Sequence, residues 1–255
     1  MVKIKTGREI TLMREAGKVA AAARQIAGNM VTAGAVTRSI DKKVHDLILS
    51  YGAVPSFLNY RGFPASICIS VNEQVIHGIP SSRRLAQGDV VSIDVGATKD
   101  GYIGDCAATF IAGGGSATSE RLVRVTRECF YEGLKYARVG YRVSDISRAI
   151  QQHAEKNGYS VVREFVGHGV GTKVHESPEV PNFIEIPRKK ADPRLLPGMT
   201  LAIEPMVNEG GAEIMVLDDK WTIVTADGKN SAHYENTILI TEGEPEVLTI
   251  CGDMP

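Results

Sequence analysis

The chain contains 255 residues, of which 43% are hydrophobic and 23% are charged, and its formal net charge is −1. This length and composition are typical of a soluble globular protein that needs neither disulfides nor a structural metal for stability. The small net charge excludes a general electrostatic attraction to nucleic acid or to an anionic membrane. The four cysteines form no Cys-x-x-Cys pair, which argues against a zinc ribbon or a disulfide scaffold.

No targeting or membrane segment is predicted. Residues 1–5 lack the apolar stretch of a signal peptide. No apolar run reaches the roughly 18 residues that a membrane-spanning helix needs. We therefore expect a cytoplasmic protein without a membrane anchor.

Helix signals occur in two pairs along the chain. Thr6 and Glu9 have the spacing of a capping box, which predicts a first helix over about residues 7–30. Apolar residues at helical spacing predict three further helices, over about residues 37–51, 118–137 and 143–157.

Apolar, strand-like runs follow each pair of helices. The runs cover residues 66–71, 90–95, 107–111, 200–203, 213–217, 221–225 and 232–240. Residues 181–197, with four prolines and the basic triplet 188–190, have the composition of a surface loop. Two helices followed by strands thus occur twice, which predicts an α+β fold with antiparallel strands covered by helices on one face.

Two aspartates lie in a predicted hairpin. Alternation along residues 90–95 places Asp94 on the face opposite to its apolar neighbours. Residues 99–101 give a turn signal, and Asp105 lies on the returning strand. A hairpin closed between residues 99 and 100 would make the two aspartates direct cross-strand partners, with Cβ atoms about 5 Å apart. A turn centred one residue later would shift the pairing by two and require a bulge.

Acids in apolar strands recur in the second half of the chain. Glu204 ends one apolar run, and Glu235 lies near the start of another. Clustered buried carboxylates repel each other and lose solvation, so a cation is expected among them. A solvated surface hairpin for the aspartates and edge positions for the glutamates remain the simpler alternatives. The occurrence of four acids in four such strands favours a site.

Three of the six histidines stand out. His168 lies between glycines, which permit close backbone approach to a ligand, and His77 and His175 lie near turns. His45, His153 and His233 are interpreted as ordinary core or helix residues. Four carboxylates and one imidazole suit Mn, Fe, Co or Zn and can hold two divalent ions about 3.5–4 Å apart.

These residues resemble type I methionine aminopeptidases in order, spacing and flanks. The matching segments are Ile69-Ser-Val-Asn-Glu, His77-Gly-Ile-Pro80, Asp94-Val-Gly, Gly101-Tyr, Gly104-Asp105, Gly167-His168-Gly169, Gly198-Met-Thr, Ile203-Glu204-Pro-Met and Trp221 to Glu235-Asn-Thr. The resemblance covers essentially the whole chain and implies one catalytic domain over residues 1–255. Its implied fold is the pita-bread (creatinase/aminopeptidase) fold, a pseudo-two-fold antiparallel sheet covered by helices on one face.

The resemblance implies hydrolytic removal of the initiator methionine from nascent polypeptides, preferably before a small second residue. A water activated by two metal ions would be the nucleophile. Glu204 would act as general base and acid, His77 would contact the scissile amide, and His175 would stabilise the oxyanion. The implied metal ligands are Asp94, Asp105, His168, Glu204 and Glu235, with Asp105 and Glu235 bridging both ions.

The resemblance also implies a methionine pocket around Tyr60, Phe63 and Trp221. The chain departs from the commoner family pattern at Phe57 and Val174, which reshapes the expected pocket. The metals would be Co, Mn, Fe, Ni or Zn, with a monovalent cation near Asn72 and Ser231. The ribosome is an expected partner, nucleic acid and membrane are not, and the enzyme is expected to be a monomer.

Two alternatives remain open at this stage. The acids alone are shared with prolidase and aminopeptidase P, so a peptidase that cleaves X-Pro bonds is one alternative. Such an enzyme would have a long N-terminal domain, whereas the first helix here is expected at about residue 7. A metal-free binding module of the same fold is the other alternative, although such relatives lose ligand residues.

Overall fold

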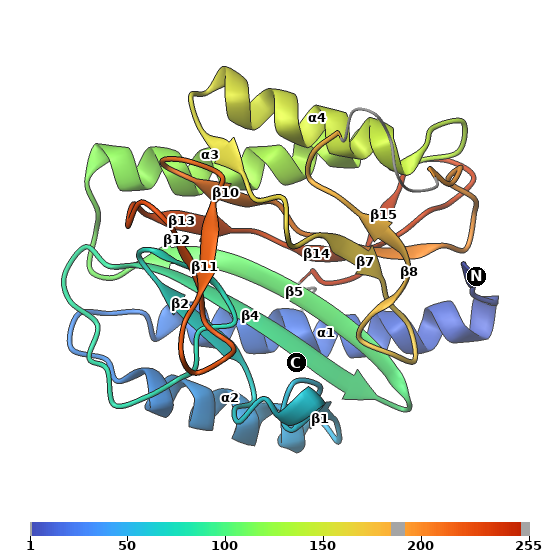
Figure 1. Ribbon diagram of the computed structural model, residues 1–255. Coiled ribbons are helices and arrows are strands. Elements are labelled where there is room, and N and C mark those ends of the chain that lie inside the picture. Colours follow the sequence, from blue (N-terminus) through green and yellow to red (C-terminus); the bar gives the residue numbers. More distant parts are fainter. Residues whose placement is uncertain (1, 185–191, 251–255) are drawn as a thin grey trace.

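The computed structural model describes residues 2–184 and 192–250 (Figure 1). Each of the four predicted helices is present within two or three residues of its expected ends. Their bounds are α1 (Gly7–Asn29), α2 (Thr37–Ser50), α3 (Ala117–Leu134) and α4 (Val143–Lys156). A short 3-10 helix, η1 (Tyr60–Gly62), lies between the first two helices and the strands that follow.

The predicted capping box begins α1. The Thr6 hydroxyl accepts a hydrogen bond from the Glu9 amide, and the Glu9 carboxylate accepts one from the Thr6 amide at 2.7 Å. The two side chains thereby satisfy backbone donors that the first helical turn leaves unpaired. The start of α1 is thus fixed locally, as the sequence predicts.

The strands occupy the predicted apolar runs, with shorter strands added between them. In the first half they are β1 (Val54–Pro55), β2 (Cys68–Val71), β3 (Gln74–Ile76), β4 (Val90–Lys99) and β5 (Tyr102–Ile111). In the second half they are β6 (Ser160–Val161), β7 (Gly167–Gly169), β8 (Glu176–Val180), β9 (Thr200–Ile203), β10 (Met206–Asn208), β11 (Ile214–Val216), β12 (Ile223–Thr225), β13 (Ser231–His233), β14 (Asn236–Leu239) and β15 (Glu246–Val247).

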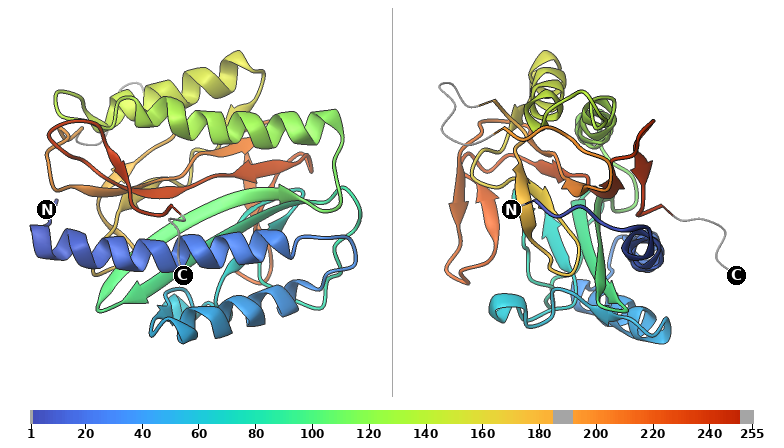
Figure 2. Two further views of the ribbon diagram at one scale, coloured as in Figure 1. Left: turned by 180° about the vertical axis from the view of Figure 1, so that it is seen from behind. Right: turned by 90° about the vertical axis from the view of Figure 1, so that its right-hand side faces the viewer.

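The strands pair antiparallel throughout the described residues. One sheet has the order β1-β4-β2 with β5 beside β4, and the largest has the order β15-β14-β9-β7-β8. Two smaller sheets have the orders β13-β10-β6 and β11-β12-β3. Seen from behind, α1 and α3 run across the strands, and the opposite face, called here the helix-free face, carries among the described residues no α-helix and only the short η1 (Figure 2). The predicted α+β arrangement with helices on one face is confirmed.

Each half of the chain packs its own helix pair against its own strands. Apolar residues of α1 and α2 form one core with β2, β4 and β5, and those of α3 and α4 form another with β9 and β14. Helix α1 lies directly on β5, where a Cβ added to Gly104 would lie 2.5 Å from the Gly17 Cα atom. Glycine at position 104 therefore allows this close contact.

The β4–β5 hairpin differs from the expected pairing of its aspartates. Its turn is centred on Asp100 and Gly101, and the register is continuous, without a bulge, from the Lys99–Tyr102 pair onward. Asp94 therefore lies opposite Ala107, and Asp105 lies opposite Gly96. The prediction that the aspartates are direct cross-strand partners is wrong. Asp100 and Gly101 accommodate the positive φ angles of a turn that lies one residue later than the predicted turn. Asp94 and Asp105 are diagonal neighbours on one face.

The single strand predicted over residues 232–240 is divided in two. The first part, β13, pairs with β10, and the second part, β14, pairs with β9. At the division, the amide and carbonyl of Glu235 bond to the carbonyl and amide of Ala107 in β5, at 2.9 and 3.2 Å. The change of partner places Glu235 beside the aspartate hairpin.

The remaining structural expectations have mixed outcomes. Cys68, Cys106 and Cys129 are buried free thiols, as predicted for the first two, and Cys251 lies outside the described residues. The predicted surface loop is described only at residues 181–184 and 192–197, and its basic triplet lies outside the described residues. No helix in the described part of the chain is long and apolar enough to cross a membrane.

Candidate metal centre

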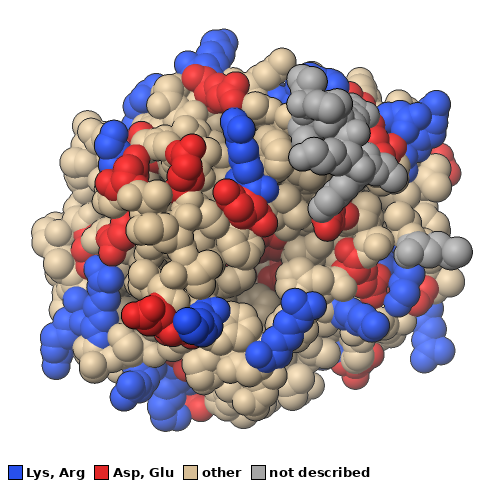
Figure 3. Space-filling model, in the orientation of Figure 1, with Lys and Arg blue, Asp and Glu red and all other residues tan. Residues whose placement is uncertain are grey.

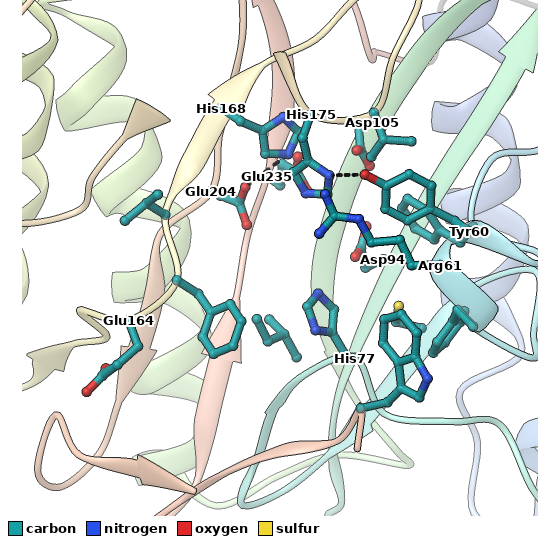
Figure 4. Close-up of a pocket in the computed structure, with 18 residues that line it drawn as sticks. Tyr60, Arg61, His77, Asp94, Asp105, Glu164, His168, His175, Glu204 and Glu235 are labelled. Carbon is teal, nitrogen blue, oxygen red and sulfur yellow. Dashed lines mark hydrogen bonds and ion pairs between the residues drawn. The ribbon is translucent and has the colours of Figure 1, made fainter. Parts of the chain in front are cut away.

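Side chains from both halves of the chain converge on one cavity. The cavity has a volume of about 300 Å³ and opens in the helix-free face, where Figure 3 shows a hollow with acidic side chains in and around it. The five predicted ligands line it together, as Figure 4 shows: Asp94 from β4, Asp105 from β5, His168 from β7, Glu204 from the end of β9 and Glu235 from between β13 and β14.

Main-chain pairing fixes the two carboxylates that come from different halves. The Asp105 amide donates to the Thr237 hydroxyl at 3.1 Å, and that hydroxyl donates back to the Asp105 carbonyl at 2.9 Å. Glu235, two residues before Thr237, is paired with Ala107 on the same strand as Asp105. The Glu235–Ala107 main-chain pair and the buried Thr237 hydroxyl thus hold the two segments side by side, with the Asp105 and Glu235 carboxylates close together.

The potential ligand atoms lie within coordination reach of one another. Ligand atoms of Asp105, His168 and Glu235 all lie within 4.8 Å of each other. The His168 Nε2 atom is 3.4 Å from a Glu204 carboxylate oxygen. Asp105 and Glu235 are only 3% and 2% exposed, so water solvates neither to any extent.

Burial and mutual repulsion make the carboxylate charges unfavourable. Burial raises the pKa of Asp94 to about 7. Burial first, and then repulsion from neighbouring carboxylates, raise the pKa values of Asp105, Glu204 and Glu235 well above their ordinary range. In the described part of the chain no lysine or arginine forms an ion pair with any of the four. The cluster therefore lacks the positive charge that it needs.

Unsatisfied oxygen atoms show where that charge belongs. Among the described residues, Asp94 Oδ1, Asp105 Oδ1 and Glu235 Oε1 are buried and accept no hydrogen bond. Buried polar atoms without partners are rare in folded proteins and point to a missing ion or ligand. Oxygen donors with one imidazole are the ligand types of divalent first-row transition metals. The residues present thus fit a divalent metal centre.

His168 is oriented for such a role. Its Nδ1 atom lies 2.9 Å from the Gly169 carbonyl, which can only accept, so Nδ1 carries the proton and Nε2 offers a lone pair. Burial first, then repulsion from His175, lowers the pKa of His168 to about 4, which keeps the ring neutral. His168 lies in strand β7, and its flanking glycines allow close packing against the neighbouring backbone: a Cβ added to Gly167 or Gly169 would lie 2.4 Å from the carbonyl oxygen of Ala202 or Ser177.

His77 and His175 line the same cavity. His77 has a φ angle of 58°, and burial, followed by repulsion from His175, lowers its pKa to about 4. The Nδ1 atom of His175 shares a 2.8 Å hydrogen bond with the Tyr60 hydroxyl, and its ring lies 4.3 Å from that of His168. Burial and the charge of Arg61 also lower the pKa of His175. Both imidazoles are neutral near pH 7.

An apolar wall adjoins the acidic cluster. Phe63 and Trp221 are in edge-to-face contact with ring centroids 5.1 Å apart, and Tyr60 lines the cavity with them. Phe57 and Val174, the two departures from the commoner pattern, also line it. Phe57 occupies the space above Gly96, where an added Cβ would lie 2.6 Å from the phenyl ring. The three aromatic residues predicted to form a pocket are therefore brought together.

Asn72 and Ser231, the residues linked by resemblance to a monovalent cation, are also neighbours. The Ser231 amide donates to the Asn72 carbonyl at 2.9 Å. The Ser231 hydroxyl donates to Asn208 at 2.8 Å, and the Asn72 side chain donates to Asp89 at 2.9 Å. Their oxygen atoms lie at the junction of the two halves, away from the carboxylate cluster.

The sequence interpretation missed His233. The structure buries this histidine to 2% exposure, with Nε2 3.7 Å from a Glu204 oxygen and 3.9 Å from a Glu235 oxygen. Among the described residues this Nε2 has no hydrogen-bond partner. Its position two residues before Glu235, and hence on the same face of the predicted strand, was the available signal. His45 and His153, in contrast, bond to Ser66 and Glu128 outside the cavity, as expected.

Comparison with known proteins identifies the family. The sequence profile of metallopeptidase family M24 matches residues 11–242. The methionine aminopeptidase of Clostridium perfringens is 51% identical over 250 residues, which span 98% of this chain and 99% of that protein. The methionine aminopeptidase of Escherichia coli is 42% identical over 254 residues, spanning 99% and 95% of the two chains.

Solved structures agree with the sequence comparison. Methionine aminopeptidase from Thermotoga maritima superposes with a TM-score of 0.94 at 41% identity and covers 98% of this chain and 100% of that chain. Prolidase from Pyrococcus furiosus superposes with a TM-score of 0.78 at 25% identity, and the match covers 96% of this chain but 65% of that chain. This chain therefore belongs to metallopeptidase family M24 and has the pita-bread fold of the methionine aminopeptidases.

Proposed function

We propose that the protein removes the N-terminal methionine from polypeptides by metal-dependent hydrolysis, with two divalent ions at the carboxylate cluster. The set of buried, unsatisfied carboxylate oxygens beside an aromatic pocket carries this proposal. Relatives that bear the name methionine aminopeptidase match nearly the whole chain and support the choice of substrate. The donor set is compatible with Co, Mn, Fe, Ni or Zn. Asp94, Asp105, His168, Glu204 and Glu235 would hold the ions.

Proton transfer is assigned to Glu204. Divalent ions at this site supply polarisation of the scissile carbonyl and a lowered pKa for the attacking water. Glu204 accepts one proton from that water as its oxygen adds to the carbonyl carbon. The same carboxyl then returns the proton to the departing amine as the C–N bond breaks.

The two neutral histidines act on the peptide bond itself. When Nδ1 of His175 accepts a hydrogen bond from the Tyr60 hydroxyl, the ring carries its proton on Nε2. This Nε2–H can then donate to the oxyanion that develops at the carbonyl. His77 lines the same cavity apart from His175 (Figure 4), and we assign it the contact with the scissile amide. Their lowered pKa values keep both rings as neutral hydrogen-bonding groups rather than cations.

The aromatic wall selects the methionine side chain. Tyr60, Phe63 and Trp221 offer ring faces and edges to the thioether, a contact that contributes about 0.3–1.5 kcal/mol beyond apolar burial. The free α-amine of the substrate, presented neutral, would coordinate beside Asp94 in the cavity. An internal peptide bond has no such amine, so the site acts on chain ends.

Further properties belong to the same proposal. The substrates are nascent polypeptides with a small second residue. The enzyme acts on them in the cytoplasm and contacts the ribosome. The enzyme acts as a monomer in which residues 1–255 form a single catalytic domain. A monovalent cation would bind near Asn72 and Ser231, whose segments are joined by a main-chain hydrogen bond.

Cleavage of X-Pro bonds is the second candidate, because prolidase shares the fold and the acids. The assay that decides compares Met-Ala-Ser, Met-Pro and another X-Pro peptide with the metal-loaded protein. We expect rapid release of methionine from Met-Ala-Ser only. A preference for the X-Pro peptides would refute the proposed substrate. No cleavage of any peptide after addition of Mn, Fe or Co would favour a metal-free binding module.

Glu204→Gln should abolish measurable turnover while the fold survives. The amide has nearly the same shape as the carboxylate but cannot accept the proton, a loss that lowers rates by about 10²–10⁴ or more. The measurement is kcat on Met-Ala-Ser, with circular dichroism for the fold and bound metal per chain as a separate readout. Activity near that of the wild-type protein would remove Glu204 from its assigned role.

His175→Ala should lower kcat by about 10²–10³, the effect of removing one oxyanion donor. His153→Ala is the matched control, because His153 bonds to Glu128 outside the cavity and should leave kcat unchanged. Steady-state kinetics on the same peptide separate kcat from KM. Equal rates for the two variants would show that His175 does not stabilise the transition state.

A further inference from the structure

A second cavity lies on the helix-covered side of the molecule, behind the carboxylate cluster. Its volume is about 300 Å³. Helices α1 and α3 form its walls and β5 lies beneath it, and Figure 2 (left) shows β5 between these two helices. We call this cavity the arginine pocket. Its lining includes Arg24, Thr109, Phe110, Arg127, His233 and Tyr234.

The arginine pocket carries uncompensated positive charge. It is lined by two arginines and by no aspartate or glutamate. Neither Arg24 nor Arg127 forms an ion pair with any described residue, whereas Arg14 and Arg138 pair with glutamates at 2.7 and 2.5 Å. Two guanidinium groups over one concave surface produce a local positive potential that favours an anion.

Arg24 is held rigidly without losing its charge. Its Nη1 donates to the Glu235 carbonyl and to the Asn236 side-chain oxygen, both at 3.0 Å, and its Nη2 donates to the Thr249 carbonyl at 3.2 Å. Nη1 also donates to the Ala107 carbonyl at 3.4 Å, and all four acceptors are neutral, so the bonds position the guanidinium but do not cancel its charge. Of its five N–H groups, Nε–H and one Nη2–H have no acceptor among the described residues.

Arg127 is not held by main-chain carbonyls of the described residues in the way that Arg24 is. Its guanidinium lies over the Tyr131 ring, 5.6 Å from the centroid, and interacts with the Tyr131 and Tyr234 hydroxyls. A hydrogen bond from Tyr234 lowers the pKa of the Tyr131 hydroxyl, and the charges of Arg127 and Arg24 lower it further. Tyr131 thus responds to the positive field of both arginines. A guanidinium stacked on a ring presents its N–H edge to a ligand.

We propose that the arginine pocket binds a phosphate-type oxyanion, either free or as the end group of a small metabolite. Arginine forks bind tetrahedral oxyanions through paired, charge-assisted hydrogen bonds. The cavity volume lies at the lower end of the range for small-molecule sites, and Phe110 and Tyr234 offer apolar surface to an organic moiety.

A ligand in this pocket would contact the segment that holds Glu235. Arg24 bonds to the main-chain carbonyl of Glu235, and His233 lines the arginine pocket while its Nε2 faces Glu204 and Glu235. The anion site is distinct from the peptide cavity, because the arginines line only the former and the five proposed ligands line only the latter.

The test is calorimetric titration of the metal-loaded full chain with inorganic phosphate and, separately, with adenosine monophosphate. Arg127→Gln removes a pocket charge, and Arg124→Gln is the matched control, because Arg124 lies on the same helix and is 60% exposed. We expect at least about tenfold weaker binding in Arg127→Gln and unchanged binding in Arg124→Gln. Phosphate bound to the metals is insensitive to Arg127, so the comparison isolates the arginine pocket.

The outcomes separate the sources of the anion. Tighter Arg127-dependent binding of the monophosphate identifies a phosphorylated metabolite as the ligand class, and tighter binding of phosphate identifies the free ion. Equal binding by the wild-type protein and Arg127→Gln, or no binding of either probe at millimolar concentration, would overturn the proposal. Methionine release by Arg127→Gln serves as evidence that the variant is folded.

Discussion

Four carboxylates line one cavity with no ion pair to a lysine or arginine among the described residues, and this determines what the protein can do. Burial raises the pKa values of Asp94, Asp105, Glu204 and Glu235, and repulsion between carboxylates raises those of the last three further. Within the described part of the chain, three of these side chains retain an oxygen without a hydrogen bond. Divalent ions remove both penalties at once, because they supply charge and occupy the free lone pairs. The cluster is therefore unfavourable as a purely structural feature and favourable as a metal centre.

The fold brings this charge together by pairing two similar halves. Each half has helices on one face and acid-bearing strands, and neither half alone holds the complete set. Main-chain bonds between Glu235 and Ala107, and the Thr237 hydroxyl bonded to Asp105, join the halves at the cluster. The helix-free face leaves the cavity open to a peptide, while the helices restrain the strands from behind.

Local signals in the sequence predict the helices, most strands and the identity of the five converging residues. Capping and periodicity are local properties, so Thr6 and Glu9 identify the start of α1 correctly. The register of Asp94 and Asp105 was predicted wrongly, because the sequence of the turn was compatible with two adjacent turn positions. Moving the turn by one residue shifts the cross-strand pairing by two residues, which keeps both aspartates on one face of the sheet. The arginine pocket depends on which strands and helices meet, and no local pattern encodes that; for His233, the spacing of two residues from Glu235 was the one local signal.

The melting temperature of the metal-free protein as a function of pH tests the central electrostatic claim most directly. Burial raises the pKa of Asp94 from 3.8 to about 7, so between these values the folded state holds a proton that the unfolded state has lost. The melting temperature should therefore fall as the pH rises from about 4 to above 7. Added Mn²⁺ should restore it at high pH, with saturation at two ions per chain. A melting temperature that does not fall over this range and does not respond to divalent ions would contradict the account.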